Sequence, residues 1–271
     1  MIKSLSDLKK QEKDNFNIPI SVQQVIPIKK IWTNGIFLIG RNQYSLTYKF
    51  TDINYAVASK EDKESMFLDY SELLNSFDSG ATTKITVALR RINKKDFEKE
   101  ILLSFKEDGL DIYRKEYNQM LLDKAINSNN MVREIYLTVT AFKKDYEEAK
   151  NYFKRIGNDI ISHLAKLGSR CSVLDATEKL RILHDFYRVG EEINYNLDIK
   201  TLMQRGHNFK DYICPDGFSF KDDYFEMGNR YGRVLFLKEY ASYIKDTMIA
   251  ELTDMNQNLM MSIDVIPIPT D

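Results

Sequence analysis

Two hydrophobic periodicities alternate along this chain, and their order restricts the folds that its 271 residues can adopt. Residues 83–92, "TKITVALRRI", and residues 133–142, "REIYLTVTAF", alternate apolar and polar side chains, as a strand with one buried face does. Residues 145–167 instead place apolar side chains at helical spacing. Strands that alternate unevenly with helices, after an antiparallel opening, favour an α+β fold over a doubly wound parallel sheet.

Helices are expected wherever the helical spacing recurs. The helix over 145–167 is the most regular, and Gly168 behind it is a typical C-cap residue. Asp175 and Glu178 have the spacing of a capping box, which predicts that a helix begins there and runs to about Tyr187. The other expected helices cover residues 60–77, 96–105, 110–125 and 245–255. The apolar stripe of the first of these consists of Met66, Phe67, Tyr70, Leu73, Leu74 and Phe77.

The first β region runs from Gln24 to Asp52 and is rich in Ile, Tyr, Phe and Val. We expect a meander of two or three antiparallel strands here, with a turn at Asn34-Gly35. Pro27 confines the first strand to a sheet edge or a bulge. Further strands are expected in "RCSVL", "DYFEMGNRY", "GRVLFLKEY" and "SIDVIPIPTD". The sequence therefore predicts an N-terminal antiparallel meander, followed by helices and strands that alternate around a mixed sheet.

The length of the chain allows one large domain or two small ones. Residues 1–17 are polar, and we expect them to form a mobile leader. Residues 18–271 are expected to form a single large α+β domain. Hydrophobic periodicity weakens and turn residues accumulate over 188–222, which is where a division into two subdomains would fall.

The charge balance and the cysteine content restrict the class of protein. Lys+Arg number 39 and Asp+Glu number 40, so the formal net charge is −1. A dedicated nucleic-acid binder would show a basic excess. The two cysteines lie far apart in sequence and suit a reducing compartment. The apolar runs are much shorter than the roughly 20 residues of a transmembrane helix, and the charged N-terminus is unlike a signal peptide. We therefore expect a cytoplasmic protein without a membrane span.

The sequence contains none of the enzyme motifs that bind phosphate or metal. GxxxxGK[ST] and GxGxxG do not occur, so the chain is not expected to bind a nucleoside triphosphate in the P-loop manner. His207 and Cys214 lie close together in sequence, but they lack the further ligands of a zinc site and the orienting group of a Cys-His nucleophile. We predict no catalytic, cofactor-binding or metal-binding residue in this chain.

Local basic pairs raise the alternative of a nucleic-acid surface. Arg230 and Arg233 flank Tyr231, and arginine beside an exposed aromatic side chain suits single-stranded nucleic acid through charge and stacking. We take these three residues as a hypothetical interaction surface. The other candidates for a basic face are Arg90, Arg91, Lys94 and Lys95. Consecutive arginines on one strand point to opposite faces of the sheet, which scatters their charge and favours protein docking over contact with DNA.

Residues 197–271, from "LDIKTLMQRGHNF" to "SIDVIPIPTD", resemble the N-terminal region of the traffic ATPases of conjugative transfer (type IV secretion). The likeness is to the VirB-four class, in the form found in Gram-positive mobile elements. The opening, "VIPIKKIWTNGIFLIGRNQYSLTYKFTD", is similar to the strand pair with which that family begins. In that family a RecA-like motor with Walker motifs follows the N-terminal domain. We interpret "SIDVIPIPTD" as a strand at an internal domain junction, and the chain as an excised N-terminal domain.

The resemblance implies a non-catalytic domain that docks on the membrane secretion complex, associates with itself and shapes the assembly of the parent motor. Its expected partners are membrane proteins of that complex and the parent motor domain. ATP and Mg²⁺ are expected only for the motor, and no cofactor is expected in this chain. Its expected location is cytoplasmic, at the inner face of the cell membrane. The alternative is a module of the same conjugation machinery that contacts single-stranded DNA.

Overall fold

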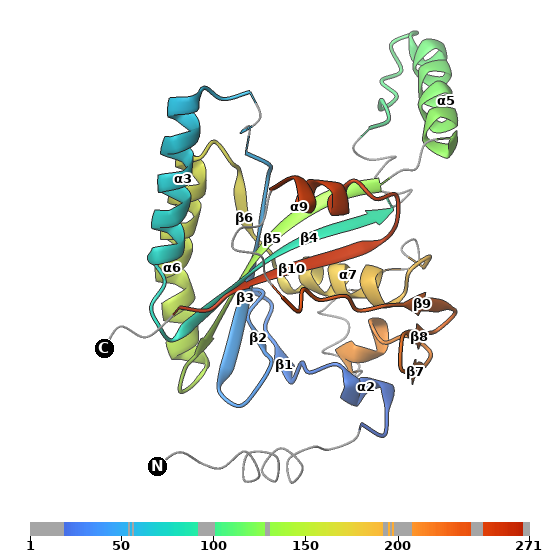
Figure 1. Cartoon of the computed structure of the whole chain (residues 1–271). Helices are drawn as coiled ribbons and strands as arrows, with labels where there is room; N and C mark the ends of the chain where they lie inside the picture. Colours follow the sequence, from blue (N-terminus) through green and yellow to red (C-terminus); the bar gives the residue numbers. More distant parts are fainter. Residues whose placement is uncertain are drawn as a thin grey trace, which may run out of the picture.

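The chain is an α+β protein, as the sequence predicts, and is built around one large antiparallel sheet (Figure 1). A computed structural model describes residues 19–53, 55, 57–91, 101–127, 131–191, 195, 197, 208–239 and 246–267. Several positions singled out in the sequence lie outside these ranges, namely the leader over 1–17, Lys94, Lys95 and His207.

The large sheet joins strands from both ends of the sequence. Its strand order is β1-β2-β3-β5-β4-β10, and β6 pairs with β3 along the same edge as β2. The strands are β1 (Lys30–Ile31), β2 (Phe37–Leu38), β3 (Gln43–Phe50), β4 (Ala81–Arg91), β5 (Met131–Phe142), β6 (Cys171–Val173) and β10 (Leu259–Val265). Every strand pair in the described residues is antiparallel, where the sequence predicts a mixed sheet. The reason is that β5 separates β3 from β4, so these two parallel strands are not neighbours.

Helices lie on both faces of this sheet. On one face α3 (Lys60–Asn75) and α6 (Tyr146–Lys166) lie side by side, and α7 (Ala176–Tyr187) lies on the opposite face (Figure 1). The capping box predicted at Asp175 and Glu178 is confirmed, since each side chain accepts a hydrogen bond from the backbone N–H of the other residue. The start of α6 is also close to the prediction, because the Asp145 side chain accepts from the N–H of Glu148.

The central elements follow the chain order β3-α3-β4-β5-α6-β6, and their sheet order is β6-β3-β5-β4. This is the split βαββαβ arrangement of ferredoxin-like domains. Three additions surround it. The β1-β2 hairpin lies beside β6 on one edge of the sheet, and β10 extends the other edge. Between β4 and β5, where a hairpin turn would suffice, the chain instead inserts a segment that carries α5 (Asp111–Asn127) and stands away from the sheet (Figure 1). We call residues 101–127 the arm.

The main core lies between the sheet and the helices α3 and α6. Alternation along β3 directs Tyr44, Leu46 and Tyr48 to this side, where they meet the apolar stripe of α6. The buried side chains of that stripe include Ala149, Tyr152, Phe153, Ile156, Ile160 and Leu164. Gly157 in the middle of α6 admits the Tyr48 ring, because a Cβ at this position would lie 3.0 Å from the Tyr48 hydroxyl oxygen.

A smaller unit joins the beginning of the chain to its second half. It contains α2 (Val22–Val25), a short 3₁₀ helix (Phe209–Tyr212), and a sheet of β7 (Phe218–Phe220), β8 (Phe225–Met227) and β9 (Arg230–Gly232). Ile26, Phe37, Leu180 and Ile213 form part of a second buried cluster, which packs α7 against the opening of the chain. The helix α9 (Asp246–Thr253) then leads into β10.

Four details differ from the sequence predictions. The chain around Gln24 forms the short helix α2 instead of a strand, and the Gln24 side chain accepts from the N–H of Ile20. Residues 101–105 are not helical, because Asn118 bonds the backbone of Leu103 on both sides. Phe67, placed on the buried stripe of α3, is 66% exposed. The fourth is the predicted strand "GRVLFLKEY", of which only Gly232 pairs in a sheet; residues 233–237 have no strand partner among the described residues.

The turn predicted at Asn34-Gly35 is confirmed between β1 and β2, and it generates a test of the fold. Gly35 has a φ of +84°, and a Cβ there would lie 2.0 Å from the carbonyl oxygen of Leu174. We expect Gly35→Ala to lower the free energy of unfolding by about 3 kcal/mol, from backbone strain and displacement of the segment before α7. Urea unfolding followed by the fluorescence of Trp32, the single tryptophan, measures this change.

The matched control is Gly168→Ala. Gly168 also has a positive φ, +76°, but a Cβ there would have no heavy atom within 4 Å. This variant should lose only the backbone term of about 1 kcal/mol. Equal losses in the two variants would show that the contact with Leu174 does not constrain the hairpin.

Candidate interaction surfaces and a buried charged cluster

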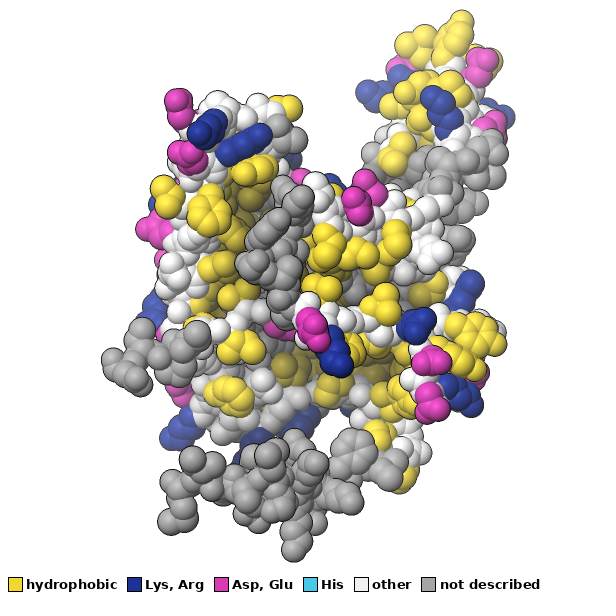
Figure 2. Space-filling view, in the orientation of Figure 1, with side chains coloured by type: hydrophobic (Ala, Val, Ile, Leu, Met, Phe, Trp, Pro, Cys, Tyr) yellow, Lys and Arg dark blue, Asp and Glu magenta, His cyan; other side chains and the backbone are white. Residues whose placement is uncertain are grey.

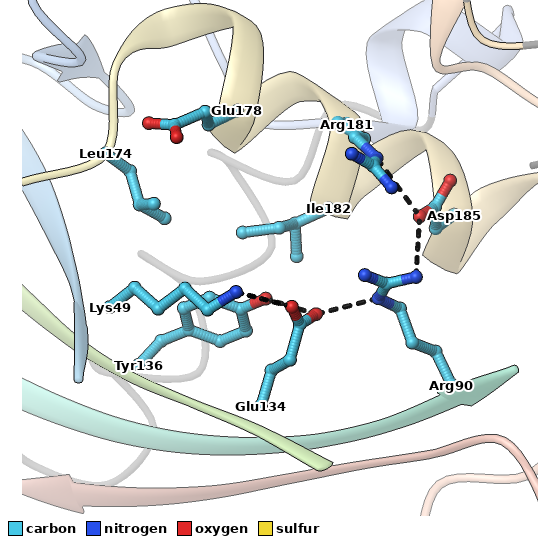
Figure 3. A pocket seen from close by; sticks show the side chains of 9 residues that line it. All are labelled: Lys49, Arg90, Glu134, Tyr136, Leu174, Glu178, Arg181, Ile182 and Asp185. Atoms are coloured by element: carbon cyan, nitrogen blue, oxygen red, sulfur yellow. Dashed lines mark hydrogen bonds and ion pairs between the residues drawn. The ribbon is translucent and has the colours of Figure 1, made fainter. Parts of the chain in front are cut away.

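The sheet face beneath α7 carries charged side chains where a purely apolar layer could have packed (Figure 3). Lys49 of β3, Arg90 of β4 and Glu134 of β5 all point to this face, and α7 supplies Arg181 and Asp185. With Tyr136 they form what we call the charged cluster. A cavity of about 100 Å³ lies among them, and its wall is completed by Leu174, Glu178 and Ile182.

Glu134 is the centre of the charged cluster. Its carboxylate accepts hydrogen bonds from Lys49 Nζ at 2.6 Å, Arg90 Nε at 2.7 Å and the Tyr136 hydroxyl at 2.8 Å. Arg90 then extends to α7, where its Nη1 lies 3.8 Å from Asp185 Oδ2. One carboxylate therefore links three neighbouring strands, and one arginine joins them to the helix above.

The electrostatics of the charged cluster favour its ionised form. Burial by itself would raise the pKa of Glu134, but the hydrogen bonds and positive charges of Arg90 and Lys49 outweigh it and bring this pKa down to about 2. Burial and the neighbouring carboxylate raise the pKa of Tyr136, so its hydroxyl stays protonated and donates. The charges of Glu134 and Asp185 outweigh the burial of Arg90 and raise its pKa as well.

The charged cluster is suited to fixing α7 rather than to binding a ligand. The cavity is small, about 100 Å³, and its lining is mostly charged or polar, which suits water. Pockets for drug-sized ligands or cofactors are several times larger, about 300 Å³ or more. Both carboxylates are buried, with side-chain exposures of 10% for Glu134 and 4% for Asp185, and both are paired with arginine.

Lys179 of α7 lies close to this face and is the most perturbed amine in the described residues. Its Nζ is 3.2 Å from the Ser45 hydroxyl and 4.2 Å from the centroid of the Phe37 ring. Burial lowers the pKa of this amine to about 7. A neutral lysine beside a serine can act as a base for a nucleophile. Ser45 is only 3% exposed, however, so its hydroxyl is closed to a substrate in this conformation.

The three residues of the hypothetical interaction surface have different roles in the structure. Arg230 Nε donates to the carbonyl oxygen of Val189 at 3.3 Å, which ties β9 to the chain after α7. Tyr231 is 78% exposed, and its ring meets that of Tyr224 edge-to-face at 5.8 Å. Arg233 is exposed. The structure therefore leaves all three residues on the surface, and Arg230 in addition makes a contact with the backbone of the chain after α7.

The basic face considered from the sequence is not assembled by the described residues. Arg90 is turned inward, since it bonds Glu134 beneath α7. The side chain of Arg91 and residues 94 and 95 lie outside the described part of the chain. The one candidate that the structure places from this group therefore serves the charged cluster.

The histidine and cysteine candidates do not form a described metal site. No group of three or more potential ligands occurs among the described residues. Cys214 is buried, and burial raises the pKa of its thiol, which disfavours the reactive thiolate. His184 is also buried and lies 3.2 Å from Asp185, so it belongs to the surroundings of the charged cluster.

The arm presents a large apolar surface that the sequence analysis did not single out. Tyr113, Tyr117 and Met120 follow one another at helical spacing on α5 and are 66%, 47% and 45% exposed. Figure 2 shows hydrophobic side chains across the arm. The other exposed apolar residues of the arm are Ile101, Leu103, Phe105, Leu110 and Ile112. A sequence signal was available, because the helical pattern of residues 111–127 has apolar residues on more than one face. A helix packed on the sheet by one side would bury only one of these faces.

Hydrogen bonds within the arm hold its shape. The Asn118 side chain donates to the carbonyl of Leu103 and accepts from its N–H, at 2.9 Å and 2.8 Å. Asp111 accepts from two backbone N–H groups, and its pKa is lowered by these bonds and by Arg114. Arg114 also bonds Asp108 through both ends of its guanidinium group. The polar groups therefore stabilise the arm from inside and leave its apolar side chains outside.

Comparison with known proteins adds no relative. No protein-family model matches this chain, and no curated protein matches it. Among the helices that the structure describes, none has both the length and the apolar character needed to cross a bilayer.

The charged cluster predicts a marked loss of stability in Glu134→Gln. An amide cannot neutralise Arg90 and Lys49, so the change leaves buried positive charge and should cost about 3 kcal/mol of unfolding free energy at pH 7. The pKa of Glu134 lies below its ordinary value of 4.5, so its contribution is present above pH 4.5 and is lost as the pH falls toward 2. The stability difference between parent and variant should shrink over that range in chemical unfolding experiments.

Glu147→Gln is the control for this change. Glu147 lies on α6 with a side chain 71% exposed and a lysine partner at 3.8 Å. Its substitution should change the unfolding free energy by less than about 0.5 kcal/mol. Similar losses for Glu134→Gln and the control would refute a central role for the Glu134 carboxylate.

Lys179 predicts a second dependence of stability on pH, in a higher range than that of Glu134. Its folded pKa of about 7 lies below its ordinary value of 10.5, so between these pH values the unfolded chain binds more protons and stability rises with pH. Lys179→Met keeps an unbranched side chain over Phe37 and removes the charge. The variant should gain stability relative to the parent at pH 6, and this gain should diminish toward pH 9. If the unfolding free energies of parent and variant had parallel pH profiles, the shifted pKa would be contradicted. The control is Lys154→Met at an exposed site on α6, which removes a surface charge.

Proposed function

We propose that this chain is the non-catalytic N-terminal docking and assembly domain of a conjugative-transfer (type IV secretion) ATPase of the VirB-four class. The family assignment rests on the resemblance of its sequence. The docking role rests on one structural observation, the arm, which projects from the body and whose apolar residues stay exposed to solvent in the described part of the chain (Figures 1 and 2). Its partners are membrane proteins of the secretion complex and the motor domain of the parent protein, and it acts at the inner face of the cell membrane.

The chemistry of the arm favours a protein as the docked partner. Aromatic side chains and methionine are enriched in protein interfaces, and exposed apolar patches on monomers commonly mark such sites. The charged residues of the arm nearly balance. Its cations are Lys106, Arg114, Lys115 and Lys124, and its anions are Glu107, Asp108, Asp111, Glu116 and Asp123. A surface of this composition offers little attraction to phosphate and much apolar area to a protein.

The internal bonding of the arm supports the same proposal. A surface that is already ordered before binding loses less conformational entropy on docking. Asn118 and Asp111 fix the segment before α5, so the helix and this segment present their apolar side chains in one arrangement. In the sequence the arm lies between β4 and β5, two adjacent strands of the large sheet.

The alternative function, contact with single-stranded DNA, has weaker support. Arg90 bonds Glu134 beneath α7, and Arg230, although exposed, donates to the carbonyl oxygen of Val189, so Tyr231 and Arg233 are the exposed residues without such a contact among those that the structure describes. Affinity for nucleic acid comes mainly from local density of positive charge. Tyr231 could still stack on a base, so this alternative receives its own measurement below.

The docking proposal is tested by replacing Tyr113, Tyr117 and Met120 together with serine. The partner is the secretion complex, solubilised from membranes of cells that carry the mobile element and immobilised for binding measurements. The variant should bind at least about tenfold more weakly than the parent chain, a loss of about 1.4 kcal/mol. The control is Phe67→Ser with Leu68→Ser on α3, where both side chains are 66% exposed and lie away from the arm. Equal binding by parent and arm variant, or no binding by the parent, would contradict the proposal.

A titration with a labelled single-stranded oligonucleotide, at low and at physiological salt, separates the two functions. We expect no binding at physiological salt. Binding that persists there, and that is lost on changing Tyr231 and Arg233 to alanine, would favour the DNA-contacting alternative.

A further inference from the structure

The segment that follows β9 has the sequence of a strand, but among the described residues it has no strand to pair with. Residues 233–239 read "RVLFLKE", and the β-prone run in their middle is extended in the structure. Val234, Leu235 and Phe236 are 75%, 78% and 79% exposed, and Leu237 is 49% exposed. Figure 2 shows hydrophobic side chains in this region, around β9 and the chain that leaves it. Four consecutive exposed apolar residues in an extended conformation are unusual for a free surface.

The backbone of this segment is available for pairing. Within the described part of the chain, no hydrogen bond or ion pair joins residues 233–239 to any other residue. The segment continues directly from β9, which is the edge strand of the small sheet. An extended chain at a sheet edge, with unpaired N–H and C=O groups, is a template for another strand.

The order of side chains in the segment makes it complementary to itself. In an antiparallel pair centred on Phe236, Arg233 lies opposite Glu239 of the second strand, and Leu235 lies opposite Leu237. By symmetry both contacts occur twice, and Phe236 lies opposite its own copy. Lys238 lies opposite Val234, so no like charges are placed directly across from one another. Such a pairing has the two-fold symmetry of most protein dimers.

We propose that residues 233–239 form an antiparallel strand pair with the same segment of a second copy of this chain, about a two-fold axis at Phe236. This proposal rests on the assembly role proposed above and deepens it, because it names the partner and the contact. The charges favour a second copy as the partner, because in this antiparallel register Arg233 of each copy lies opposite Glu239 of the other. The apolar side chains between them would leave the solvent at the same time.

The first test measures the oligomeric state of the full chain by sedimentation equilibrium over a range of concentrations. The parent should form a dimer that dissociates on dilution. Arg233→Glu should weaken the dimer at least tenfold, since symmetry places two pairs of like charges in the contact. Glu239→Arg should do the same for the same reason. The double variant, Arg233→Glu with Glu239→Arg, restores both opposite-charge pairs and should restore the dimer.

Lys238→Glu is the matched control within the segment. It reverses a charge on the same strand, but opposite Val234, so it should leave the dissociation constant within about threefold of the parent value. A parent chain that stays monomeric at all concentrations would overturn the proposal. The proposal would also be overturned if the single charge reversals left the dimer as stable as in the parent chain, or if the double variant did not restore it.

A cross-linking experiment tests the register independently. Cysteine at position 236 would meet its own copy at the two-fold axis, within the 4.4–6.8 Å between Cα atoms that a disulfide needs, about the spacing of directly opposed strand residues. Phe236→Cys should therefore form an interchain disulfide under mild oxidation. Leu235→Cys opposes Leu237 and should not. Burial raises the pKa of both native thiols, that of Cys171 to about 11, so they react slowly. Equal cross-linking at 235 and 236 would refute the register.

The arm variant distinguishes failure of this proposal from failure of the docking role. If the arm docks on the secretion complex, the serine variant of α5 loses that binding and keeps the dimer. The charge reversals at Arg233 and Glu239 should lose the dimer and keep the arm's affinity for the complex.

Discussion

The carboxylate of Glu134 binds cationic side chains from both strands that flank its own. Lys49 and Arg90 each approach it at less than 3 Å, and the Tyr136 hydroxyl donates to it from the same strand. Arg90 also forms an ion pair with Asp185 of α7, which joins the sheet to this helix. The face of a ferredoxin-like sheet that lies opposite its two helices would otherwise need an apolar cover. Here a charged cluster fixes a helix on that face, and this helix in turn packs against the opening of the chain.

The additions to this sheet lie outside its core. The arm is inserted between β4 and β5, and these strands pair over eleven residues, from Ala81 to Arg91. Asn118, Asp111 and Arg114 bond within the arm, and its apolar side chains remain outside. The segment after β9 is a second feature of the same kind, an apolar run that has no strand partner in the part of the chain that the structure describes. Both features leave apolar area exposed that a self-sufficient monomer would bury, which is the physical basis for a role in assembly.

Two arginines that the sequence suggested as surface charges bind partners within the chain. From the sequence, Arg90 belongs to a pair of basic residues that could attract phosphate, and Arg230 belongs to an arginine-aromatic surface. In the structure Arg90 compensates a buried carboxylate, and Arg230 bonds a backbone carbonyl. Neither partner is close in sequence: Glu134 is 44 residues from Arg90, and Val189 is 41 residues from Arg230. Local sequence pattern therefore identified exposed residues correctly at Arg230, Tyr231 and Arg233, but it did not predict the inward contact of Arg90.

The sequence by itself determined the type and the approximate ends of most elements. Alternation fixed which side chains of β4 and β5 share a face, and the capping box set the start of α7, because these signals depend on neighbours within a few residues. Only the tertiary structure decided which strands are adjacent, which is why the sheet is antiparallel and not mixed. It also decided that the backbone of Leu103 bonds the Asn118 side chain, so that residues 101–105 are not helical. The β-prone run after β9 likewise pairs with no strand that the structure describes. The hydrophobic pattern of an element indicates which of its sides is buried. Which other element covers that side depends on contacts between residues far apart in the chain.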